Sequence, residues 1–414
     1  MTMKLKLAAG AATLTVLALV GCGGQGGGGS SASGGKTTLT WFMWSGSNEE
    51  VQAWKHVGAM VTAKYPKITV KFQTTSFPDY WTKLAAQASG GNAACILGMQ
   101  SLRAPGLGQL LKPLDDLAKQ NGVNMADFDK SITQGLTTNG KLIAVPYDFG
   151  PLVIYYNKTA FKKAGVPEPK PGWTVQDFLS AGKSLTSGKK YGFAAFPLPD
   201  WMIPWGMSLY GVNPVSAAGK ATLTAPDFVK AMQWYVDLVQ KEKIAPPVPA
   251  TNDYSWPVNQ FLSGNAAMDV DGPWDLINTK SQAKFDVGIA PMPAGADGSK
   301  TVSAGSGFGI SASCKAPAEA MKAIAVITGP AAEQYLGEQG RAFPARIKQQ
   351  QYWYKNAVPG AKETLVAASA SAVPYRTTAK WNQISQLLVQ YGIEAMNGQS
   401  SVEKVLQNVQ QQAG

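Results

Sequence analysis

The segment KLIAVPYDFGPLVIYYNK, residues Lys141–Lys158, contains two apolar runs rich in β-branched and aromatic residues. The runs are Lys141–Pro146 and Leu152–Tyr156, and the residues between them, Tyr147–Pro151, include a glycine and a proline. Because glycine and proline interrupt regular strand pairing, the pattern predicts a strand, a bend over Tyr147–Pro151 and a second strand.

A second run of the same kind, Ala266–Trp274 (AAMDVDGPW), follows much later in the chain. Mixed strand and helix patterns lie on both sides of each run. Two separated strand segments, each leaving one α/β region for another, predict a chain that crosses between two lobes more than once. Each crossing can act as a hinge.

Strand and helix patterns alternate before the first crossing. Thr37–Trp44 is β-branched and aromatic, and Glu49–Tyr65 carries apolar residues at helical spacing. This alternation predicts parallel strands joined by helical connections. In open sheets of this kind, ligand-facing groups lie just beyond the carboxyl ends of the strands. Further strands are expected at Ile68–Gln73 and Cys95–Met99, with a helix at Asp79–Ser89 between them. The rule therefore points to Trp44, Ser45, Phe77–Tyr80, Gln100 and Arg103.

The later part of the chain also mixes the two patterns and becomes wholly helical towards its end. Strands are expected at Tyr191–Ala195, Ala266–Val270, Phe285–Ala290 and Val302–Ser311. Helices are expected at Trp173–Thr186, Pro226–Lys243, Pro317–Thr328, Ala331–Gln339, Arg346–Asn356, Ala379–Met396 and Val402–Gln411.

The amino terminus indicates export. Lys4 and Lys6 precede an apolar run, Leu7–Val20, which is too short to span a bilayer comfortably and is typical of a secretory signal. Gly21 and Cys22 follow, as in a bacterial lipoprotein signal, where small residues precede the lipidated cysteine, and an almost pure Gly and Ser segment comes next. We therefore predict a signal peptide over residues 1–21, lipidation of Cys22 and a flexible tether over residues 22–36. An ordinary signal with a chance cysteine is the alternative.

Two further cysteines, Cys95 and Cys314, lie in a chain exported to a disulfide-permissive space. An even pair in that setting predicts a disulfide, with two buried thiols as the alternative. The net charge of the chain is +11, which falls to +9 without the two lysines of the signal. No basic run of five or more occurs, so the charge favours a soluble surface over nucleic-acid binding, although it leaves a phosphorylated ligand open.

Catalytic and metal-binding motifs are weak in this sequence. The only histidine, His56, lies within the first expected helix, away from any nucleophile motif, and the histidine and cysteine counts exclude the usual zinc clusters. The glycine-rich segments lack the spacing of phosphate or dinucleotide loops. Asp148 and Asp271 could act as a glycosidase pair if held at the right separation, or could accept hydrogen bonds from a bound neutral ligand. No cofactor or metal is expected.

Aromatic residues give the strongest functional pattern. Trp44, Trp201, Trp205 and Trp274 are all expected in or beside loops. A pyranose presents apolar C–H faces and a rim of hydroxyls, so its site needs flat rings for stacking and planar polar groups for paired hydrogen bonds. Core packing is the alternative for each ring.

The order and spacing of several short motifs resemble the extracellular solute-binding proteins of ATP-driven importers, in particular the sugar-binding branch that includes maltose-binding protein. The matching pieces are Gly140–Pro146, Tyr155–Lys158, Gly172–Thr174 with Asp177-Phe178, Phe261–Gly264 with Ala267-Met268, and Gly272–Trp274. The resemblance implies a type II periplasmic-binding-protein fold, in which two lobes, each a mixed sheet flanked by helices, enclose a ligand cleft. It also implies binding without catalysis.

The resemblance assigns further ligand-binding residues. Gly272–Trp274 matches a hinge motif that carries a stacking tryptophan, Arg341 lies in a loop that the family brings to the cleft, and Tyr375-Arg376 matches the family's last ligand loop. The expected ligand-binding residues are Trp44, Ser45, Phe77, Tyr80, Gln100, Asp148, Trp201, Trp205, Asp271, Trp274, Arg341, Tyr375 and Arg376.

We expect lobe one to contain residues 37–151 and 271–316, and lobe two to contain residues 152–270 and 317–414. From the amino-terminal signal we expect a lipid-anchored monomer that faces the extracellular or periplasmic side of a bacterial membrane. The resemblance implies that it delivers a mono- or oligosaccharide to the transmembrane permease subunits of an ABC importer. A binder of a polyol or a glycerol phosphate, a carbohydrate-active hydrolase, and an adhesin or sensor lipoprotein are the alternatives.

Overall fold

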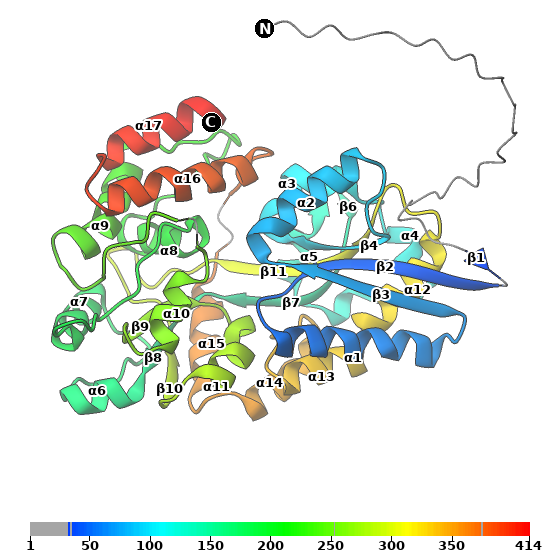
Figure 1. Ribbon diagram of the computed structural model, residues 1–414, viewed down its shortest axis with the longest axis horizontal. Coiled ribbons are helices and arrows are strands. Elements are labelled where there is room, and N and C mark those ends of the chain that lie inside the picture. The colour runs from blue at the N-terminus through cyan, green and yellow to red at the C-terminus, as the bar shows by residue number, and fades with distance from the viewer. Residues whose placement is uncertain (1–31, 34, 252, 374–375) are drawn as a thin grey trace, which may run out of the picture.

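The computed structural model describes residues 32–33, 35–251, 253–373 and 376–414. The predicted lipidation site Cys22 and the predicted ligand residue Tyr375 lie outside the described residues. Within the described part, none of the helices combines the length and the apolar character needed to cross a membrane. The chain forms two lobes side by side, and each has its own hydrophobic core (Figure 1).

Lobe one is built on a mixed sheet of six strands. Its order is β1-β2-β4-β11-β7, with β3 paired to the other side of β2. Strand β2 runs parallel to β3 and β4, whereas β11 is antiparallel to both β4 and β7. The strands are β1 (Ala32–Ser33), β2 (Lys36–Trp44), β3 (Ile68–Thr75), β4 (Ile96–Gln100), β7 (Val145–Pro151) and β11 (Ser303–Ile310).

Helices cover both faces of this sheet, with α1 on one side and α2 on the other (Figure 1). Helix α1 begins where the Ser47 hydroxyl accepts a hydrogen bond from the Glu50 N–H, and its buried face contains Trp54, Val57 and Val61. The longer helices are α1 (Asn48–Lys64), α2 (Phe77–Ser89), α12 (Pro317–Ile327), α13 (Pro330–Glu338) and α14 (Gln350–Asn356). Shorter elements are η1 (Ser101–Arg103), α3 (Ala104–Leu107), α4 (Asp115–Gln120), α5 (Lys130–Gly135), β5 (Thr137–Thr138) and β6 (Lys141–Leu142).

Lobe two is built on a smaller sheet, in which β8 lies between β10 and β9. Both pairings are antiparallel, where a mixed sheet is expected from the sequence. The strands are β8 (Val153–Asn157), β9 (Met268–Asp271) and β10 (Val287–Ala290). Its helices are α6 (Lys158–Ala164), α7 (Val175–Leu185), α8 (Pro199–Tyr210), α9 (Pro226–Gln240), α10 (Trp256–Leu262), α16 (Trp381–Met396) and α17 (Val402–Ala413).

The bend predicted over Tyr147–Pro151 is wrong, because these residues belong to β7. Strand β11 pairs with β7 through this run, with Ser303 opposite Pro151 and Ala304 opposite Gly150. The proline is accommodated because it ends the strand, where its missing N–H disrupts little pairing. The chain leaves the first sheet only at Leu152, and β8 begins at the next residue.

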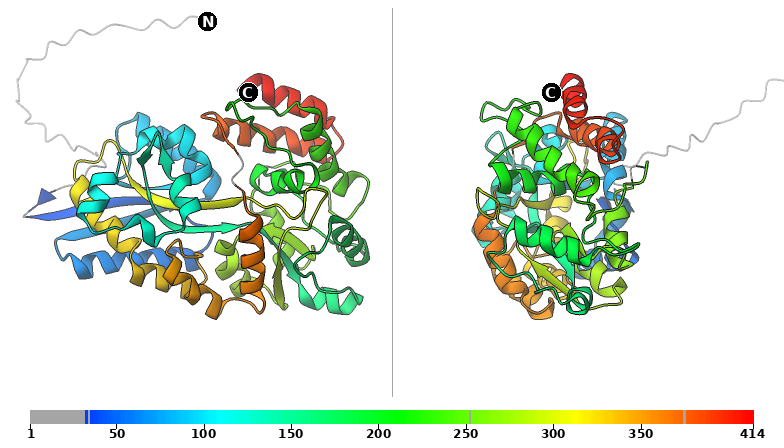
Figure 2. Two further views of the ribbon diagram at one scale, coloured as in Figure 1. Left: turned by 180° about the vertical axis from the view of Figure 1, so that it is seen from behind. Right: turned by 90° about the vertical axis from the view of Figure 1, so that its left-hand side faces the viewer.

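Three segments of the chain meet beside Leu152. The Thr301 hydroxyl donates to the Leu152 carbonyl at 2.7 Å, the Thr301 N–H donates to the Ser371 carbonyl, and the Thr301 carbonyl accepts from the Val373 N–H at 2.8 Å. Thr301 is 1% exposed. Helix α15 (Ala361–Ser371) leads into this point and lies between the lobes in the left view of Figure 2. One threonine therefore links three stretches that pass between the lobes.

Packing assigns some segments differently from the expected lobe boundaries. Helices α12 and α13 contribute Met321, Ile324 and Leu336 to the first core, although residues 317–414 are expected in lobe two. Strand β10 pairs in the second sheet, although residues 271–316 are expected in lobe one. Sequence patterns locate these elements but do not show which lobe they pack against.

The disulfide expected from the sequence is present. Cys95 and Cys314 form a disulfide within lobe one, with their Cα atoms 4.7 Å apart.

Helix α8 and helix α15 have no counterpart among the elements expected from the sequence. At the second crossing, η4 (Pro273–Asp275) and α11 (Leu276–Gln282) follow β9. The Gly150 backbone lies so close to Pro273 that an added Cβ would be 2.4 Å from the proline ring. The two crossings of the chain therefore touch each other.

Candidate ligand-binding site

Four rings at the ends of β2 and α2 form a compact group, which we call the aromatic cluster: Trp44, Phe77, Tyr80 and Trp81. The Trp44 ring lies 5.1 to 5.2 Å from each of the other three ring centroids. Tyr80 is fully buried, and its hydroxyl donates to the Gly98 carbonyl at 2.8 Å. Phe77 is only half-buried, so it is the member of the cluster with the most exposed surface.

Arg103, at the end of η1, joins the aromatic cluster to lobe two. Its guanidinium lies over the rings of Phe77 and Trp81 at 4.9 and 4.7 Å and donates to the Gln100 side-chain carbonyl. An Arg103 Nη1 atom is 3.8 Å from the Asp200 carboxylate, which belongs to the first turn of α8 in lobe two. This ion pair therefore connects the two lobes.

Backbone packing reinforces the same junction. Leu102, the neighbour of Arg103, is a member of the second hydrophobic core although η1 follows a strand of the first sheet. Gly106 approaches the turn before α16 so closely that an added Cβ would lie 2.4 Å from the Ala379 carbonyl oxygen. The segment after β4 thus reaches across to α8 and α16.

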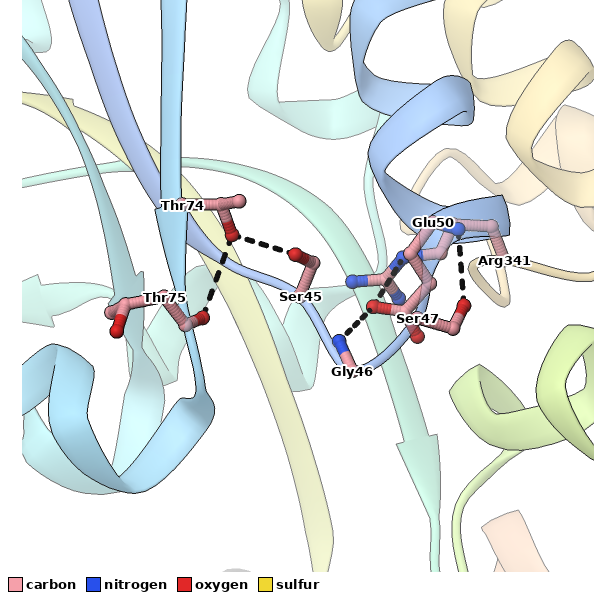
Figure 3. A network of polar contacts seen from close by, with 7 residues as sticks. All are labelled: Ser45, Gly46, Ser47, Glu50, Thr74, Thr75 and Arg341. Atoms are coloured by element: carbon pink, nitrogen blue, oxygen red, sulfur yellow. Dashed lines mark hydrogen bonds and ion pairs between the residues drawn. The ribbon is translucent and has the colours of Figure 1, made fainter.

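The loop between β2 and α1 is held by a polar network (Figure 3). The Ser45 hydroxyl is 2.6 Å from the Thr74 hydroxyl, and the Ser45 N–H donates to the Thr75 carbonyl at 3.0 Å. The Glu50 carboxylate accepts a hydrogen bond from the Gly46 N–H at 2.8 Å. The same carboxylate oxygen is 3.6 Å from the Arg341 Nε atom, so Glu50 ties the loop to Arg341.

Arg341 and Asp148 belong to one buried charged group in lobe one. The Arg341 guanidinium lies 4.9 Å from the Trp54 ring centroid, and the Asp148 carboxylate accepts from the Ser306 N–H at 2.8 Å. Burial raises the pKa of Asp148 to about 7, although Arg341 and the Ser306 hydrogen bond act in the opposite direction. Two members of this group, Asp148 and Arg341, were expected from the sequence as ligand-binding residues. The third member, Glu50, was not expected.

Asp271 and Trp274 lie together at the second crossing. Trp274 hydrogen-bonds the Asp271 carboxylate and is partly exposed. Its ring packs onto Gly272, where an added Cβ would be 2.3 Å from ring atoms. Burial, and then the neighbouring charges of Asp275 and Asp269, raise the pKa of Asp271 well above its ordinary value.

The remaining predicted ligand residues are spread over lobe two. Trp201 and Trp205 lie within helix α8, so their expected loop position is wrong. Trp205 is 0% exposed and packs against Phe178 and Phe193, which is the packing of a core residue. Trp201 is half-buried one residue from Asp200. Arg376 is exposed, and its Nε donates to the Val215 carbonyl at 2.7 Å.

The structure thus brings the predicted residues together in three places. Phe77 and Gln100 contact Arg103, and Trp44 and Tyr80 belong to the same aromatic cluster. Asp148 lies with Arg341, and Asp271 lies with Trp274. Sequence reasoning missed Asp200, Glu50 and Trp81. Asp200 gave no signal because it lies in the first turn of α8, a helix that was not expected from the sequence. Trp81 was missed because it has the helical spacing of a core residue. Among the described residues, no group of three or more His, Cys, Asp or Glu side chains has a geometry suited to a metal ion.

Comparison with known proteins places these features in a family context. Residues 45–334 match the family model described as bacterial extracellular solute-binding protein. The sn-glycerol-3-phosphate-binding periplasmic protein UgpB of Pectobacterium atrosepticum is 28% identical over 241 residues, which cover 53% of this chain and 52% of that protein. The chain therefore spans about half the length of the curated relatives it matches.

Two solved structures share nearly the whole architecture. The ABC substrate-binding protein Lmo0181 from Listeria monocytogenes, in complex with cycloalternan, matches with a TM-score of 0.84 and 23% identity over 91% of this chain and 97% of that one. UgpB from Mycobacterium tuberculosis, in complex with glycerophosphocholine, matches with a TM-score of 0.77 and 24% identity over 92% and 98%. At these identities the likeness shows the fold, and the predicted two-lobed architecture is confirmed.

Proposed function

Since this chain belongs to the bacterial extracellular solute-binding proteins, we propose that it captures a mono- or oligosaccharide between its lobes and delivers it to the permease of an ABC-type importer. The observation that carries the proposal is the Arg103–Asp200 ion pair at the aromatic cluster. It joins the lobes at a place where flat rings and planar hydrogen-bonding groups lie side by side. These are the two kinds of group that a pyranose needs.

Trp274 supplies a second stacking surface in this proposal. Its partly exposed ring is fixed by Gly272 beneath it and by Asp271 at its N–H. We include Trp44, Ser45, Phe77, Gln100, Trp201, Asp271, Trp274 and Arg103 in the proposed site. Tyr80 and Trp205 are left out because both rings are fully buried, and Arg341 with Asp148 is proposed to support the Ser45 loop through Glu50.

The proposal includes closure of the lobes on the sugar. A ligand favours the closed state only through contacts that the open state lacks, and this differential affinity is what the importer would recognise. Packing supports lobe boundaries in which α12, α13 and α14 belong to lobe one and β10 belongs to lobe two.

We also propose that a lipid on Cys22 anchors a monomer outside the membrane. Release of the Cys22→Ala variant from the membrane fraction would support the anchor, and unchanged association would refute it.

A screen of neutral sugars tests the function. Thermal unfolding measured with a panel of mono- and oligosaccharides should show a higher midpoint for at least one of them, because a ligand that binds only the folded state stabilises it. The same sugar should be recovered without new reducing ends, since the family and the solved neighbours are substrate-binding proteins. Release of reducing ends that is lost in Asp148→Asn would instead support a hydrolase.

Glycerol phosphate is the second candidate ligand. It is favoured by the relatives that are named as sn-glycerol-3-phosphate-binding proteins. A shift of the midpoint with sn-glycerol 3-phosphate and with no neutral sugar would select this candidate.

A further inference from the structure

Each buried arginine among the described residues lies close to a carboxylate. The sequence contains four arginines, and three of them are buried. Each of the three has a carboxylate partner within 4 Å: Arg103 with Asp200, Arg341 with Glu50, and Arg346 with Asp127. The fourth, Arg376, is exposed and binds a backbone carbonyl. Among the described residues, no buried guanidinium therefore lacks a carboxylate.

Arg103 is the arginine at the proposed site. Only 5% of its side-chain surface and 13% of that of Asp200 are exposed. Two rings cover the guanidinium, and Gln100 and Asp200 face its Nη1 atom. The Nε–H has no hydrogen-bond partner among the described residues. One donor on a buried, charge-neutralised arginine is therefore unsatisfied in this structure.

This environment discriminates between ligand classes on physical grounds. A guanidinium stays protonated, and a buried one needs a counter-charge. Asp200 supplies that charge from the other lobe. A phosphate or carboxylate approaching Arg103 would have to come close to Asp200, and like charges repel strongly where water is excluded. A sugar hydroxyl can accept from the free Nε–H without this repulsion.

We propose that Asp200 is a specificity-determining residue, which restricts the site to uncharged polyhydroxylated ligands by neutralising Arg103 from the opposite lobe. The inference rests on the proposed function, because it concerns which solute the interlobe site accepts. The relatives leave two ligand classes open, neutral sugars and glycerol phosphates, and the proposal favours neutral sugars.

Removal of the Asp200 charge tests the proposal directly. Titration calorimetry should show that Asp200→Asn binds sn-glycerol 3-phosphate at least about tenfold more tightly than the wild-type protein, because the repulsive carboxylate is gone while Arg103 remains. Asp200→Glu should reject the phosphate as the wild type does. The double variant Arg103→Met/Asp200→Asn should lose the gain, which would assign it to the freed guanidinium.

Asp227→Asn is the matched control. Asp227 also lies in the first turn of a lobe-two helix, α9, but its side chain is exposed and it has no arginine partner among the described residues. This variant removes the same charge from the same kind of helix position and should leave phosphate binding unchanged. An equal gain in Asp227→Asn would show that net charge alone is responsible and would overturn the proposal.

Other outcomes are equally decisive. Unchanged phosphate affinity in Asp200→Asn, including no measurable binding in either protein, would overturn the proposal, as would wild-type binding of the phosphate more tightly than of any neutral sugar. If Asp200→Asn does not fold, the wild-type protein alone still tests the proposal. sn-Glycerol 3-phosphate should bind at least about tenfold more weakly than the neutral sugar that gives the largest rise of the unfolding midpoint, and equal or tighter binding would overturn the proposal. Failure of the proposed function itself is a separate result, namely no response to any neutral sugar in the thermal screen.

Discussion

Asp148 shows how burial sets the behaviour of a single residue in this protein. Its carboxyl group is enclosed by lobe one, and its pKa is raised to about 7, first by loss of solvation. Arg341 and the Ser306 N–H hold the charged form but do not compensate the burial. The tyrosine beside it, Tyr147, is also buried, and its pKa is raised well above the ordinary value for the same first reason.

The first prediction concerns the pH dependence of stability. In the unfolded chain Asp148 titrates near 3.8, and in the folded protein near 7. The folded state therefore holds a proton that the unfolded state has lost over this range, so the stability contributed by the group is complete below about pH 4 and is lost as the pH rises through about 7. Urea unfolding of Asp148→Asn should show a smaller decrease in unfolding free energy than the wild type between these limits. Parallel pH curves for the two proteins would contradict the assignment.

The second prediction concerns Trp274. Trp274→Ala should weaken sugar binding by more than about tenfold, since truncating an aromatic anchor removes the stacking surface. Calorimetric titration gives the affinity, and thermal unfolding checks that the variant is folded. Trp234→Ala is the control, because Trp234 is also a partly buried lobe-two tryptophan but packs against the core residue Trp205. Unchanged affinity in Trp274→Ala would remove Trp274 from the site.

Residue-scale prediction succeeded where a side chain follows a recognisable strand end. Gln100 ends β4 and binds Arg103, and Ser45 follows β2 and binds the end of β3. It was less informative for tryptophans, since Trp205 and Trp274 occur in similar sequence surroundings and one is fully buried while the other is partly exposed. Composition cannot separate these cases, because exposure is decided by elements that pack from far along the chain. The ligand role of each predicted residue stays a prediction.

At the scale of elements, the crossings between the lobes depend on close backbone contacts. Gly150 in β7 packs directly on Pro273 of η4. The Leu152 N–H donates to the Val302 carbonyl, and the Thr301 hydroxyl donates to the Leu152 carbonyl. We infer that motion between the lobes is concentrated at the residues around Thr301, where three segments meet.

The third prediction concerns this meeting point. Thr301→Val keeps the shape of the side chain but leaves the Leu152 carbonyl without its hydroxyl donor, which should cost about 1–3 kcal/mol of unfolding free energy. Thr328→Val is the matched control, because Thr328 is equally buried and donates at 2.8 Å to the Ile324 carbonyl within lobe one. Both variants should lose stability in urea unfolding, but only Thr301→Val should change sugar affinity. Equal effects of the two variants on binding would argue against a hinge role for Thr301.

The sequence predicted most elements of lobe one because their patterns are local. Helix α1 has an N-cap serine, acidic residues in its first turn and apolar residues at helical spacing, and it forms within one residue of the expected start. Helix α8 was missed because Pro199 and Pro204 lie within it, and proline normally indicates a turn. The bend expected in β7 was wrong because pairing with β11, which lies far away in the sequence, overrides the local preference of Gly150 and Pro151.

At the scale of the whole molecule, the order of the motifs predicted the two-lobed architecture correctly, whereas the packing of the lobes required the structure. The disulfide joins Cys95 to Cys314 across a separation of 219 residues, so it fixes distant parts of lobe one to each other. The Arg103–Asp200 ion pair is the corresponding contact between the lobes. We infer that the disulfide belongs to a rigid lobe, whereas the Arg103–Asp200 ion pair forms when the lobes close and breaks when they open.

Small-angle X-ray scattering of the protein with and without a saturating neutral sugar tests the central claim most directly. Closure of two rigid lobes on the ligand predicts a smaller radius of gyration in the saturated protein than in the free protein, with the decrease following the binding curve. A radius of gyration that stays constant at full saturation would contradict the claim that the lobes close on a captured sugar.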